Sequence, residues 1–253
     1  MRRAVTIKMT LAYVGTRYAG WQVQPGRPTI QGVLEDRLAR LLQEPITLFG
    51  AGRTDSGVHA LGQVASFATA RGVPLDGLRR GLNARLPEDI RVLEAQEAPD
   101  AFHARSDARG KEYAYTFSLG EVTSPFRAPF VCPVRGRLDL EAMRRGAAGF
   151  EGRHDFTSLA PASCELEDRV RTITLARIEA APGEEVVLRV RGDGFLRHMI
   201  RTLAGTLLDI GRGRRCAEEV PGILAARDRR AAGPCAAARG LTLVKVFYPE
   251  AGA

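Results

Sequence analysis

A glycine-rich segment from Phe49 to Phe67, FGAGRTDSGVHALGQVASF, carries the densest group of side chains that could perform chemistry. Its glycines allow tight or left-handed backbone, so the segment can approach a ligand closely. A carboxylate there could act as a nucleophile or base, and a guanidinium could bind phosphate. The polar side chains fall together in one turn between apolar stretches: Arg53, Thr54, Asp55, Ser56 and His59.

The same residues also fit a purely structural turn. Asp55 could accept hydrogen bonds from the backbone amides of Ser56 and Gly57, as aspartate often does in turns that contain glycine. Arg53 would then be solvated, and His59 would cap the end of a strand. The spacing alone leaves both interpretations open.

The elements around this segment form a first run. Residues 5–13 alternate apolar and polar side chains, which predicts a half-buried strand. Helical spacing follows from residue 30, with Thr29 as the predicted N-cap, until Pro45 ends the pattern. The remaining elements predicted for this run are strands at 46–49 and 62–67, a helix at 74–82 and a strand at 90–97.

A second run repeats this order without obvious sequence identity. Tyr113, Tyr115, Phe117 and Leu119 share one face of its first predicted strand. The other predicted elements are a helix at 139–150, strands at 170–180 and 186–190, a long helix over 196–208, a short helix at 217–226 and a strand at 241–248. Each run therefore has the order β-α-β-β-α-β.

This order predicts an α+β fold made of two RRM-like halves, each a ferredoxin-like or split βαβ unit with an antiparallel sheet. In such a unit the helices cover one face of the sheet and leave the other face free for a partner. We expect the halves to comprise residues 1–105 and 106–253, because Ser106, Asp107 and Gly110 interrupt the pattern. A central basic cleft would lie between the two sheets.

Composition favours a folded protein with a polyanionic partner. The chain has 253 residues, 45% of them hydrophobic and 26% charged, so it can build one large or two small cores without a disulfide or metal. Its 37 Lys and Arg residues against 29 Asp and Glu residues give a net charge of +8, nearly all from arginine. Guanidinium groups bind phosphates and stack on bases, which favours nucleic acid as the partner. An arginine bias can also reflect codon composition or thermal adaptation.

Several classes of protein are disfavoured. The cysteines Cys132, Cys164, Cys216 and Cys235 lie far apart without a C-x-x-C pair, so we predict neither disulfides nor a zinc site. No P-loop or dinucleotide motif indicates a cofactor. No apolar run reaches the roughly 20 residues of a membrane span, and the N-terminal residues alternate where a leader would be continuously apolar. We therefore expect a cytoplasmic protein with no metal, no cofactor and no membrane partner.

Seven ordered sequence blocks resemble one known family. They are YVGTRYAGWQVQ, GAGRTDSGVHALGQV, LNARLPEDI, FHARSDARGKEYAY, GRHDFTS, GDGFLRHMIRTLAG and GLTLVKVFYP, and they span nearly all of the chain. On these blocks the chain resembles the TruA family of tRNA pseudouridine synthases. The resemblance implies the pseudouridine synthase fold and a homodimer that acts on tRNA, with no DNA partner. It also implies isomerisation of uridine at positions 38 to 40 of the anticodon stem-loop.

The nucleophilic aspartate of that family matches Asp55. Forming pseudouridine breaks the N1–C1′ bond, turns the uracil, joins C5 to C1′ and removes the C5 proton, without oxidation or hydrolysis. A carboxylate could attack C1′, attack uracil C6 or remove a sugar proton, and the sequence leaves these routes open. Covering the carboxylate with the base favours its neutral form, which a nearby cation would offset.

By the same resemblance, Arg53 and Arg201 are the candidate cations, with Arg201 expected to pair with the carboxylate, and Tyr113 is the active-site tyrosine. Tyr113 could stack on the extruded uracil or help to move the C5 proton. Arg201 and Tyr113 both have structural alternatives. Arg197 and Arg201 lie four residues apart on a predicted helix and could simply be solvated, and Tyr113 could be a core residue like Tyr115.

Further residues of the blocks are expected near the site or along the RNA path. Arg53 could fill the space that a flipped base vacates, whereas Trp21 could equally anchor the core. The set comprises Arg53, Trp21, Gln22, His59, His103 and Arg105. Charge alone adds weaker candidates for phosphate contacts: Arg79, Arg80, Arg169 and Arg171.

Two other functions fit parts of the pattern. A non-catalytic RNA-binding protein would keep the sheets and the basic cleft but convert no uridine. A phosphate-ester hydrolase would use the glycine-rich loop, release phosphate and depend on Mg²⁺. The hydrolase is the weaker alternative, because no clustered carboxylates accompany Asp55.

Overall fold

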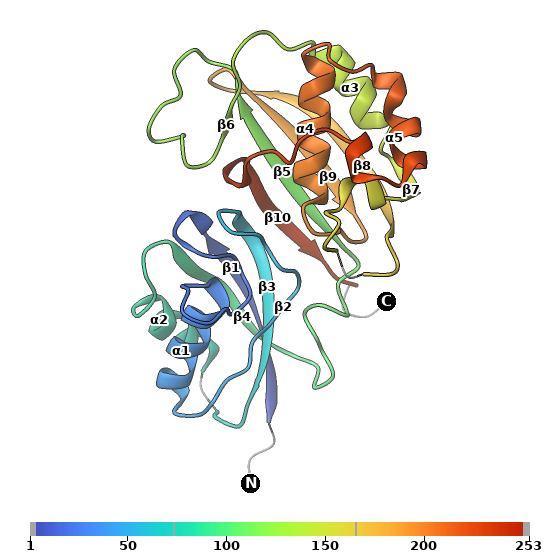
Figure 1. Cartoon of the computed structure of the whole chain (residues 1–253). Coiled ribbons are helices and arrows are strands. Elements are labelled where there is room, and N and C mark those ends of the chain that lie inside the picture. Colours follow the sequence, from blue (N-terminus) through green and yellow to red (C-terminus); the bar gives the residue numbers. More distant parts are fainter. Residues whose placement is uncertain (1–3, 73, 165, 250–253) are drawn as a thin grey trace. The chain divides into compact units, whose positions relative to one another are not determined.

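The computed structural model describes residues 4–72, 74–164 and 166–249 (Figure 1). Contacts divide the chain into two compact units. Unit 1 is Met1–Arg109 with Leu243–Ala253, and unit 2 is Gly110–Thr242. The residues from Leu243 on thus group with unit 1, whereas the sequence analysis assigned them to the second half. The division into two domains at residue 105 stays a prediction.

Unit 1 combines a sheet with two helices. The strand order is β4-β1-β3-β10, and the short β2 also pairs with β3. β1 runs antiparallel to both β3 and β4. The elements are β1 (Val5–Tyr13), the 3₁₀-helix η1 (Gly15–Arg17), α1 (Ile30–Leu42), β2 (Phe49–Gly50), β3 (His59–Thr69), α2 (Leu75–Asn83), β4 (Ile90–Ala98) and β10 (Leu241–Phe247).

Local sequence signals account for much of unit 1. β1 alternates as predicted and buries Ile7, Met9, Leu11 and Tyr13. α1 begins where expected, because the Thr29 hydroxyl accepts a hydrogen bond from the Gly32 amide at 3.2 Å. It ends before Pro45, since Gln43 adopts a left-handed backbone with φ 55°. α1 and α2 lie side by side, with Leu41 of α1 against Gly81 of α2 (Figure 1).

The sheet face that carries Lys8 and Ser66 is partly covered by the chain itself. The Ala104 amide donates to the Ser66 hydroxyl at 3.0 Å, and the Tyr248 hydroxyl donates to the Ala104 carbonyl at 2.6 Å. The Lys8 ammonium lies 4.4 Å from the centre of the Tyr248 ring. A simple split βαβ unit would leave this face of the sheet free. Here the face is covered over the middle of β1 and β3.

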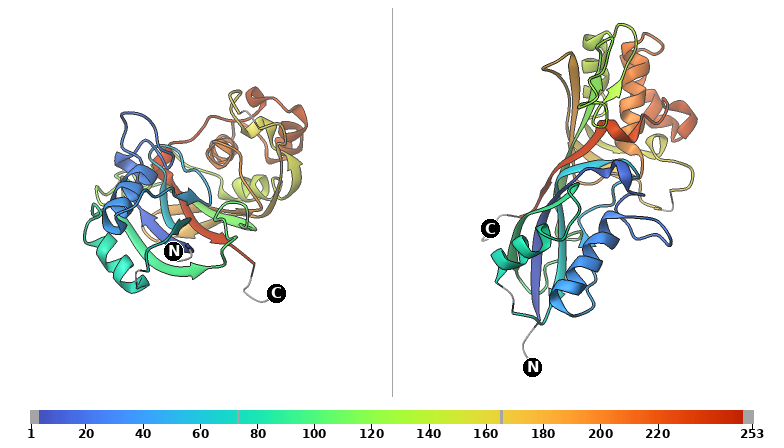
Figure 2. Two further views of the ribbon diagram at one scale, coloured as in Figure 1. Left: turned by 90° about the horizontal axis from the view of Figure 1, so that it is seen from below. Right: turned by 90° about the vertical axis from the view of Figure 1, so that its left-hand side faces the viewer.

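Unit 2 combines further strands with helices on one face. Its strand order is β5-β9-β8-β7 with antiparallel pairing, and β6 pairs parallel with β5. The strands and α-helices are β5 (Gly110–Ser118), β6 (Cys132–Pro133), α3 (Leu140–Ala148), β7 (Gly152–Asp155), β8 (Val170–Ala181), β9 (Glu185–Gly192), α4 (Met199–Gly211) and α5 (Val220–Ala226). The 3₁₀-helices are η2 (Thr157–Leu159), η3 (Ala217–Glu219), η4 (Arg229–Ala231) and η5 (Ala238–Gly240). Figures 1 and 2 show α3, α4 and α5 together on one side of this sheet.

Helix packing and aromatic residues form the core of unit 2. Tyr115 and Phe117 of β5 are fully buried, as the alternative of a core strand predicted for them. Gly146 of α3 allows that helix to approach Leu207 and Ile210 of α4. β6 and β7 are only two and four residues long and have no counterpart among the elements predicted from the sequence. The chain as described is an α+β fold with mostly antiparallel strands.

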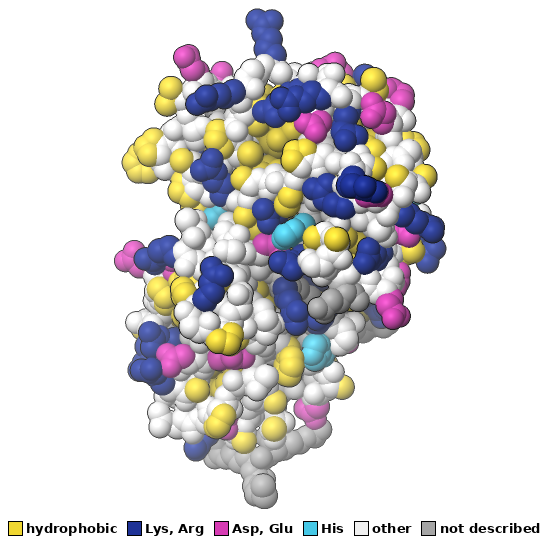
Figure 3. Space-filling model, in the orientation of Figure 1, with side chains coloured by type: hydrophobic (Ala, Val, Ile, Leu, Met, Phe, Trp, Pro, Cys, Tyr) yellow, Lys and Arg dark blue, Asp and Glu magenta, His cyan; other side chains and the backbone are white. Residues whose placement is uncertain are grey.

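Charge on the molecular surface is mixed. Figure 3 shows basic side chains spread over the visible face, with acidic side chains beside several of them. Many arginines are in ion pairs, such as Arg17 with Asp89 at 2.7 Å and Arg127 with Glu185 at 2.7 Å. The net charge of +8 therefore does not by itself mark a binding surface. Across the described residues, no helix is both long and apolar enough to span a membrane.

Candidate active site

The Asp55 loop connects β2 to β3 and contains a tight turn. The Val58 amide donates to the Asp55 carbonyl at 3.1 Å, and Gly57 at the third position has φ 79°, which a side chain would disfavour. Asp55 is half-buried and Arg53 is exposed. Gly57 therefore adopts the left-handed backbone that the glycines of this segment are predicted to allow.

The segment before α1 holds this loop from one side. The Trp21 amide donates to the Thr54 carbonyl at 3.0 Å, and the Ser56 hydroxyl donates to the Tyr18 carbonyl at 3.0 Å. The carbonyls of Gly20 and Trp21 accept from the first amides of α1. A Cβ on Gly20 would lie 2.7 Å from the Thr54 carbonyl, so only glycine permits this approach. The loop is thus tied to the start of α1.

His59 and Gly15 hold the loop from another side. His59 is 3% exposed, and its Nδ1 accepts a hydrogen bond from the Gly15 amide at 3.1 Å. Neutral His59 therefore carries its proton on Nε2. A Cβ on Gly15 would lie 2.0 Å from the Val58 carbonyl, so the two backbones are in direct contact. This geometry favours a supporting role for His59, and its contact with RNA stays a prediction.

Trp21 lies in the core of unit 1. It is 2% exposed, its ring centre is 6.2 Å from that of Tyr13, and a Cβ on Gly50 would meet the indole at 2.5 Å. Gln22, the next residue, is half-buried. The position of Trp21 matches the alternative of a core anchor, with the Asp55 loop attached to its backbone.

The segment from Phe102 to Asp107 forms a second polar feature of unit 1. The Nδ1 atom of His103 accepts from the amides of Arg105 and Ser106 at 3.2 and 3.3 Å. The imidazole lies 4.9 Å from the ring of Phe49, which is 47% exposed, and Arg105 is also exposed. The exposed Phe49 ring therefore lies beside the His103 imidazole, which also accepts from the backbone of the exposed Arg105.

Tyr113 lies on β5 of unit 2 opposite Val190. It is 7% exposed, and the Phe195 ring meets it edge-on with a centroid distance of 5.4 Å. Phe195 belongs to the turn GDGF between β9 and α4. The sequence analysis assigned no role to it, although the block GDGFLRHMIRTLAG contains it.

Arg201 lies in the first turn of α4 and is half-buried. Its Nε donates to the Ala236 carbonyl at 2.9 Å, and the Ala236 amide donates back to the Arg201 carbonyl at 3.0 Å. The Tyr115 hydroxyl donates to the next carbonyl, that of Ala237, at 2.8 Å. We call residues 233–237 the strap. The alternative that Arg201 is simply solvated is wrong, whereas Arg197 is exposed.

The strap itself carried no sequence signal, because it binds Arg201 through a backbone carbonyl that any residue provides. Its contact with α4 depends on Gly205, where a Cβ would lie 1.8 Å from the Pro234 carbonyl. The Gly233 amide also donates to the Thr206 hydroxyl at 2.9 Å. A glycine in the middle of an apolar helix was the available hint of close backbone approach.

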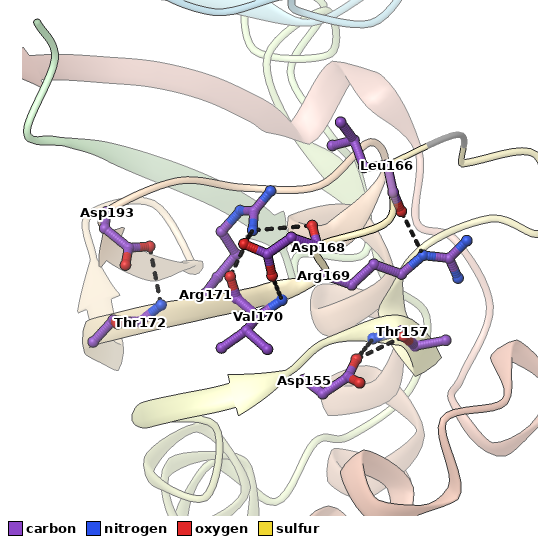
Figure 4. Close-up of polar contacts among 9 residues, drawn as sticks. All are labelled: Asp155, Thr157, Leu166, Asp168, Arg169, Val170, Arg171, Thr172 and Asp193. Carbon is purple, nitrogen blue, oxygen red and sulfur yellow. Dashed lines mark hydrogen bonds and ion pairs between the residues drawn. The ribbon is translucent and has the colours of Figure 1, made fainter. Parts of the chain in front are cut away.

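The weaker arginine candidates are engaged with the protein. Arg79 and Arg80 pair with Asp76 at 2.9 and 2.8 Å. Figure 4 shows Arg169 donating through Nε to the Leu166 carbonyl at 3.1 Å, and Arg171 donating through Nη1 to the Val170 carbonyl at 2.5 Å. Their contact with phosphate stays a prediction.

Asp155, at the end of β7, gives a pH-dependent prediction. Its carboxylate accepts from the Thr157 amide and hydroxyl at 2.9 and 2.6 Å (Figure 4), and Arg227 lies 3.1 Å away. Burial raises the pKa of Asp155, but the Thr157 hydrogen bonds and the charges of Arg227 and Arg169 together outweigh it and lower the pKa. The stabilisation is therefore complete above the unfolded pKa of about 3.9 and is lost as pH falls through the folded pKa.

We expect Asp155→Asn to lower the free energy of unfolding at pH 7 by about 1 kcal/mol. The difference from wild type should narrow as the pH falls below about 4. Urea unfolding of both proteins at pH 7 and pH 3 measures the difference in the free energy of unfolding. An equal difference at both pH values would show that the charge of Asp155 contributes nothing to stability.

A family model and several similar proteins assign this chain to the same family. The family described as "tRNA pseudouridine synthase" matches residues 9–107 and 147–249, which include Asp55 and Arg201, while Tyr113 lies between the two matched segments. The "tRNA pseudouridine synthase A" of Myxococcus xanthus is 47% identical over 96% of this chain and 92% of its own length. Proteins of the same name from Geotalea uraniireducens (strain Rf4) and Brevibacillus brevis are 45% and 44% identical, each over 96% of this chain and 99% of their own length. This chain therefore belongs to the tRNA pseudouridine synthase family.

Proposed function

We propose that this protein converts uridine to pseudouridine in tRNA, at positions 38 to 40 of the anticodon stem-loop. The observation that carries the isomerase activity is the family match over residues 9–107 and 147–249. Relatives named "tRNA pseudouridine synthase A" at 43–47% identity support tRNA as the substrate. The positions within the tRNA follow from the resemblance of the seven blocks to the TruA family.

Asp55 is the proposed nucleophile. The reaction is balanced within the nucleotide, because the N1–C1′ bond breaks, a C5–C1′ bond forms, N1 gains a proton and C5 loses one. Attack on C1′, attack on C6 and removal of a sugar proton all use a carboxylate held in place. The turn at Gly57 and the hydrogen bonds from Trp21 and Ser56 support such a role, because they fix the backbone on both sides of Asp55.

Arg201 and Tyr113 are proposed to serve the same reaction from unit 2. Arg201 supplies the positive charge that keeps a carboxylate ionised, and its bond to the Ala236 carbonyl supports a fixed guanidinium. Tyr113 is proposed to stack on the flipped uracil, and the edge-on contact with Phe195 restrains its ring.

Of the remaining candidates, we propose that some contact RNA and that others support the Asp55 loop. The exposed Arg53 would fill the space vacated by the flipped base, and Arg105 would contact RNA beside Phe49 and His103. Gln22, half-buried after Trp21, would lie at the edge of the RNA path. Trp21 and His59, both buried, would act by supporting the Asp55 loop.

The finer architecture is also a proposal. The order β1, α1, β2, β3, α2, β4 in unit 1 supports an RRM-like, split βαβ half. In unit 2 the order β5, α3, β8, β9, α4 matches the first five elements of a second half, and the last strand, β10, groups mainly with unit 1. We also propose a central basic cleft, from the duplicated order of elements, a cytoplasmic location, from the scattered cysteines, and a homodimer, which the resemblance to the TruA family implies.

Tritium release tests the function. The wild-type protein is incubated with tRNA labelled with tritium at uracil C5, and a matched tRNA with cytidine at positions 38 to 40 serves as the control. We expect release to solvent from the first tRNA and none from those positions in the second. Tight binding without release would indicate a non-catalytic RNA-binding protein. Mg²⁺-dependent release of phosphate would indicate a hydrolase.

Gly205→Ala is expected to reduce kcat by about 10- to 100-fold. Its Cβ would lie 1.8 Å from the Pro234 carbonyl, so the strap that holds Arg201 must move. Tritium release under saturating tRNA measures the effect. Gly222→Ala on α5 is the matched control, because nothing lies within 4 Å of its Cβ. Equal activity of the two variants would show that the strap does not influence catalysis.

A further inference from the structure

Three buried polar side chains lie beneath the Asp55 loop. They are Tyr13 at the end of β1, Thr54 in the loop and Gln63 in β3, which are 4%, 7% and 0% exposed. The Tyr13 hydroxyl lies 2.8 Å from the Thr54 hydroxyl. Gln63 Nε2 donates to the Tyr13 hydroxyl at 3.3 Å and to the Gly52 carbonyl at 2.9 Å. We call these three side chains the Tyr13 network.

A bulge in β3 lies beside the network. Leu11 lies opposite Gln63, but Tyr13 lies opposite Ala60, so β3 has one more residue than β1 across this interval. Bulges of this kind re-aim side chains and are common beside active sites. Leu11 and Gln63 are directly opposite, and Tyr13 is two residues from Leu11, so Tyr13 and Gln63 lie on the same face of the sheet beside this bulge.

The Tyr13 hydroxyl is buried and takes part in both hydrogen bonds to neighbouring side chains. Burial raises the pKa of Tyr13 to about 12, although the hydrogen bonds with Thr54 and Gln63 lower it, so the hydroxyl stays protonated at neutral pH. The Gln63 amide donates to the Tyr13 oxygen, and in the Tyr13–Thr54 bond either hydroxyl can be the donor. An amide and two hydroxyls buried without these bonds would each incur a desolvation penalty.

The Tyr13 network binds alternate residues of the Asp55 loop. Gly52 and Thr54 are bound by it, while Arg53 between them is exposed and Asp55 after them is half-buried. We propose that Tyr13, Thr54 and Gln63 are positioning residues, which fix the backbone of the loop so that the Asp55 carboxylate and the Arg53 guanidinium project in set directions. The proposal rests on the catalytic role of Asp55 proposed above, and it assigns a task to residues that do not touch the nucleotide.

Hydroxyl deletions test the network. Tyr13→Phe and Thr54→Val each remove one hydroxyl with little change in shape, and Thr54→Ser restores the hydroxyl. Thr69→Val is the matched control, since Thr69 is buried at the far end of β3, where its hydroxyl bonds Glu44. We expect kcat for tritium release to fall about 10- to 100-fold in Tyr13→Phe and Thr54→Val with little change in KM. Thr54→Ser and Thr69→Val should stay within about threefold of wild type.

A second measurement does not depend on activity. Amide hydrogen exchange of the peptide covering residues 50–60, followed by mass spectrometry, should accelerate in Tyr13→Phe and Thr54→Val but not in Thr69→Val. If exchange in this peptide is unchanged by Tyr13→Phe, the network does not hold the loop and the proposal is wrong. If the wild type releases no tritium, the proposed function fails, and the exchange result still decides the network. Faster exchange with full kcat would also overturn the positioning role.

Discussion

Asp55→Asn is expected to abolish tritium release from C5-labelled tRNA, with a rate at least about 10⁴-fold below the wild type. The substitution keeps the size of the side chain and removes its negative charge. Attack on C1′, attack on C6 and removal of a sugar proton all need that charge, so the expected loss does not depend on the route. Single-turnover release with enzyme in excess of tRNA measures the chemical step separately from product release.

The control for this substitution is Asp76→Asn. Asp76 is an exposed carboxylate of α2 that pairs with Arg79 and Arg80, and it lies in the same unit as Asp55. Its variant should isomerise tRNA at the wild-type rate. Binding of the stem-loop by Asp55→Asn should persist, because the contacts with RNA backbone come from other residues. Release of tritium by Asp55→Asn at a rate near that of wild type would remove Asp55 from the mechanism.

Arg201→Ala is expected to reduce kcat by about 10²- to 10³-fold. A preorganised cation is most effective where its orientation is fixed, and the bond from Nε to the Ala236 carbonyl fixes this guanidinium. Arg201→Lys should recover little of the lost rate. The planar guanidinium can bond the strap through Nε and still direct its other N–H groups towards a second partner, whereas a lysine ammonium cannot reproduce this geometry. Tritium release at saturating tRNA measures both variants.

Arg197→Ala separates the role of Arg201 from general loss of positive charge. Arg197 precedes α4 and is exposed, so its loss removes the same charge without disturbing the strap. We expect Arg197→Ala to keep kcat within about twofold of wild type. Equal losses in the two alanine variants would mean that Arg201 acts only through the net charge of the surface.

Local patterns in the sequence predicted the elements that depend on local physics. The alternation of β1 and the Thr29 cap of α1 both appear where expected, because burial of one face and capping of free amides involve neighbouring residues. Boundaries were less accurate. β3 extends from His59 to Thr69, beyond the predicted 62–67, because pairing with β1 continues past the apolar run.

The contacts that support the candidate site were beyond local patterns. Tyr13 and Gln63 are 50 positions apart in the chain, and only strand pairing brings them together. Arg201 meets Ala236 through a backbone carbonyl, which has no signature in the sequence. The roles of Asp55, Tyr113 and Arg201 came from family resemblance, since a carboxylate in a glycine-rich turn has the same appearance whether it reacts or only shapes the turn.

The return of the last strand to unit 1 bears on how the protein is synthesised. Residues 243–247 of β10 group with the unit that begins at the N-terminus, and the Val244 carbonyl lies against Gly62 of β3. On the ribosome the edge of β3 that receives β10 stays unpaired until residues 110–242 of unit 2 have been translated. Unit 1 is therefore completed only after unit 2 has been made, so a chain that terminates within unit 2 leaves the edge of β3 unpaired and prone to aggregation.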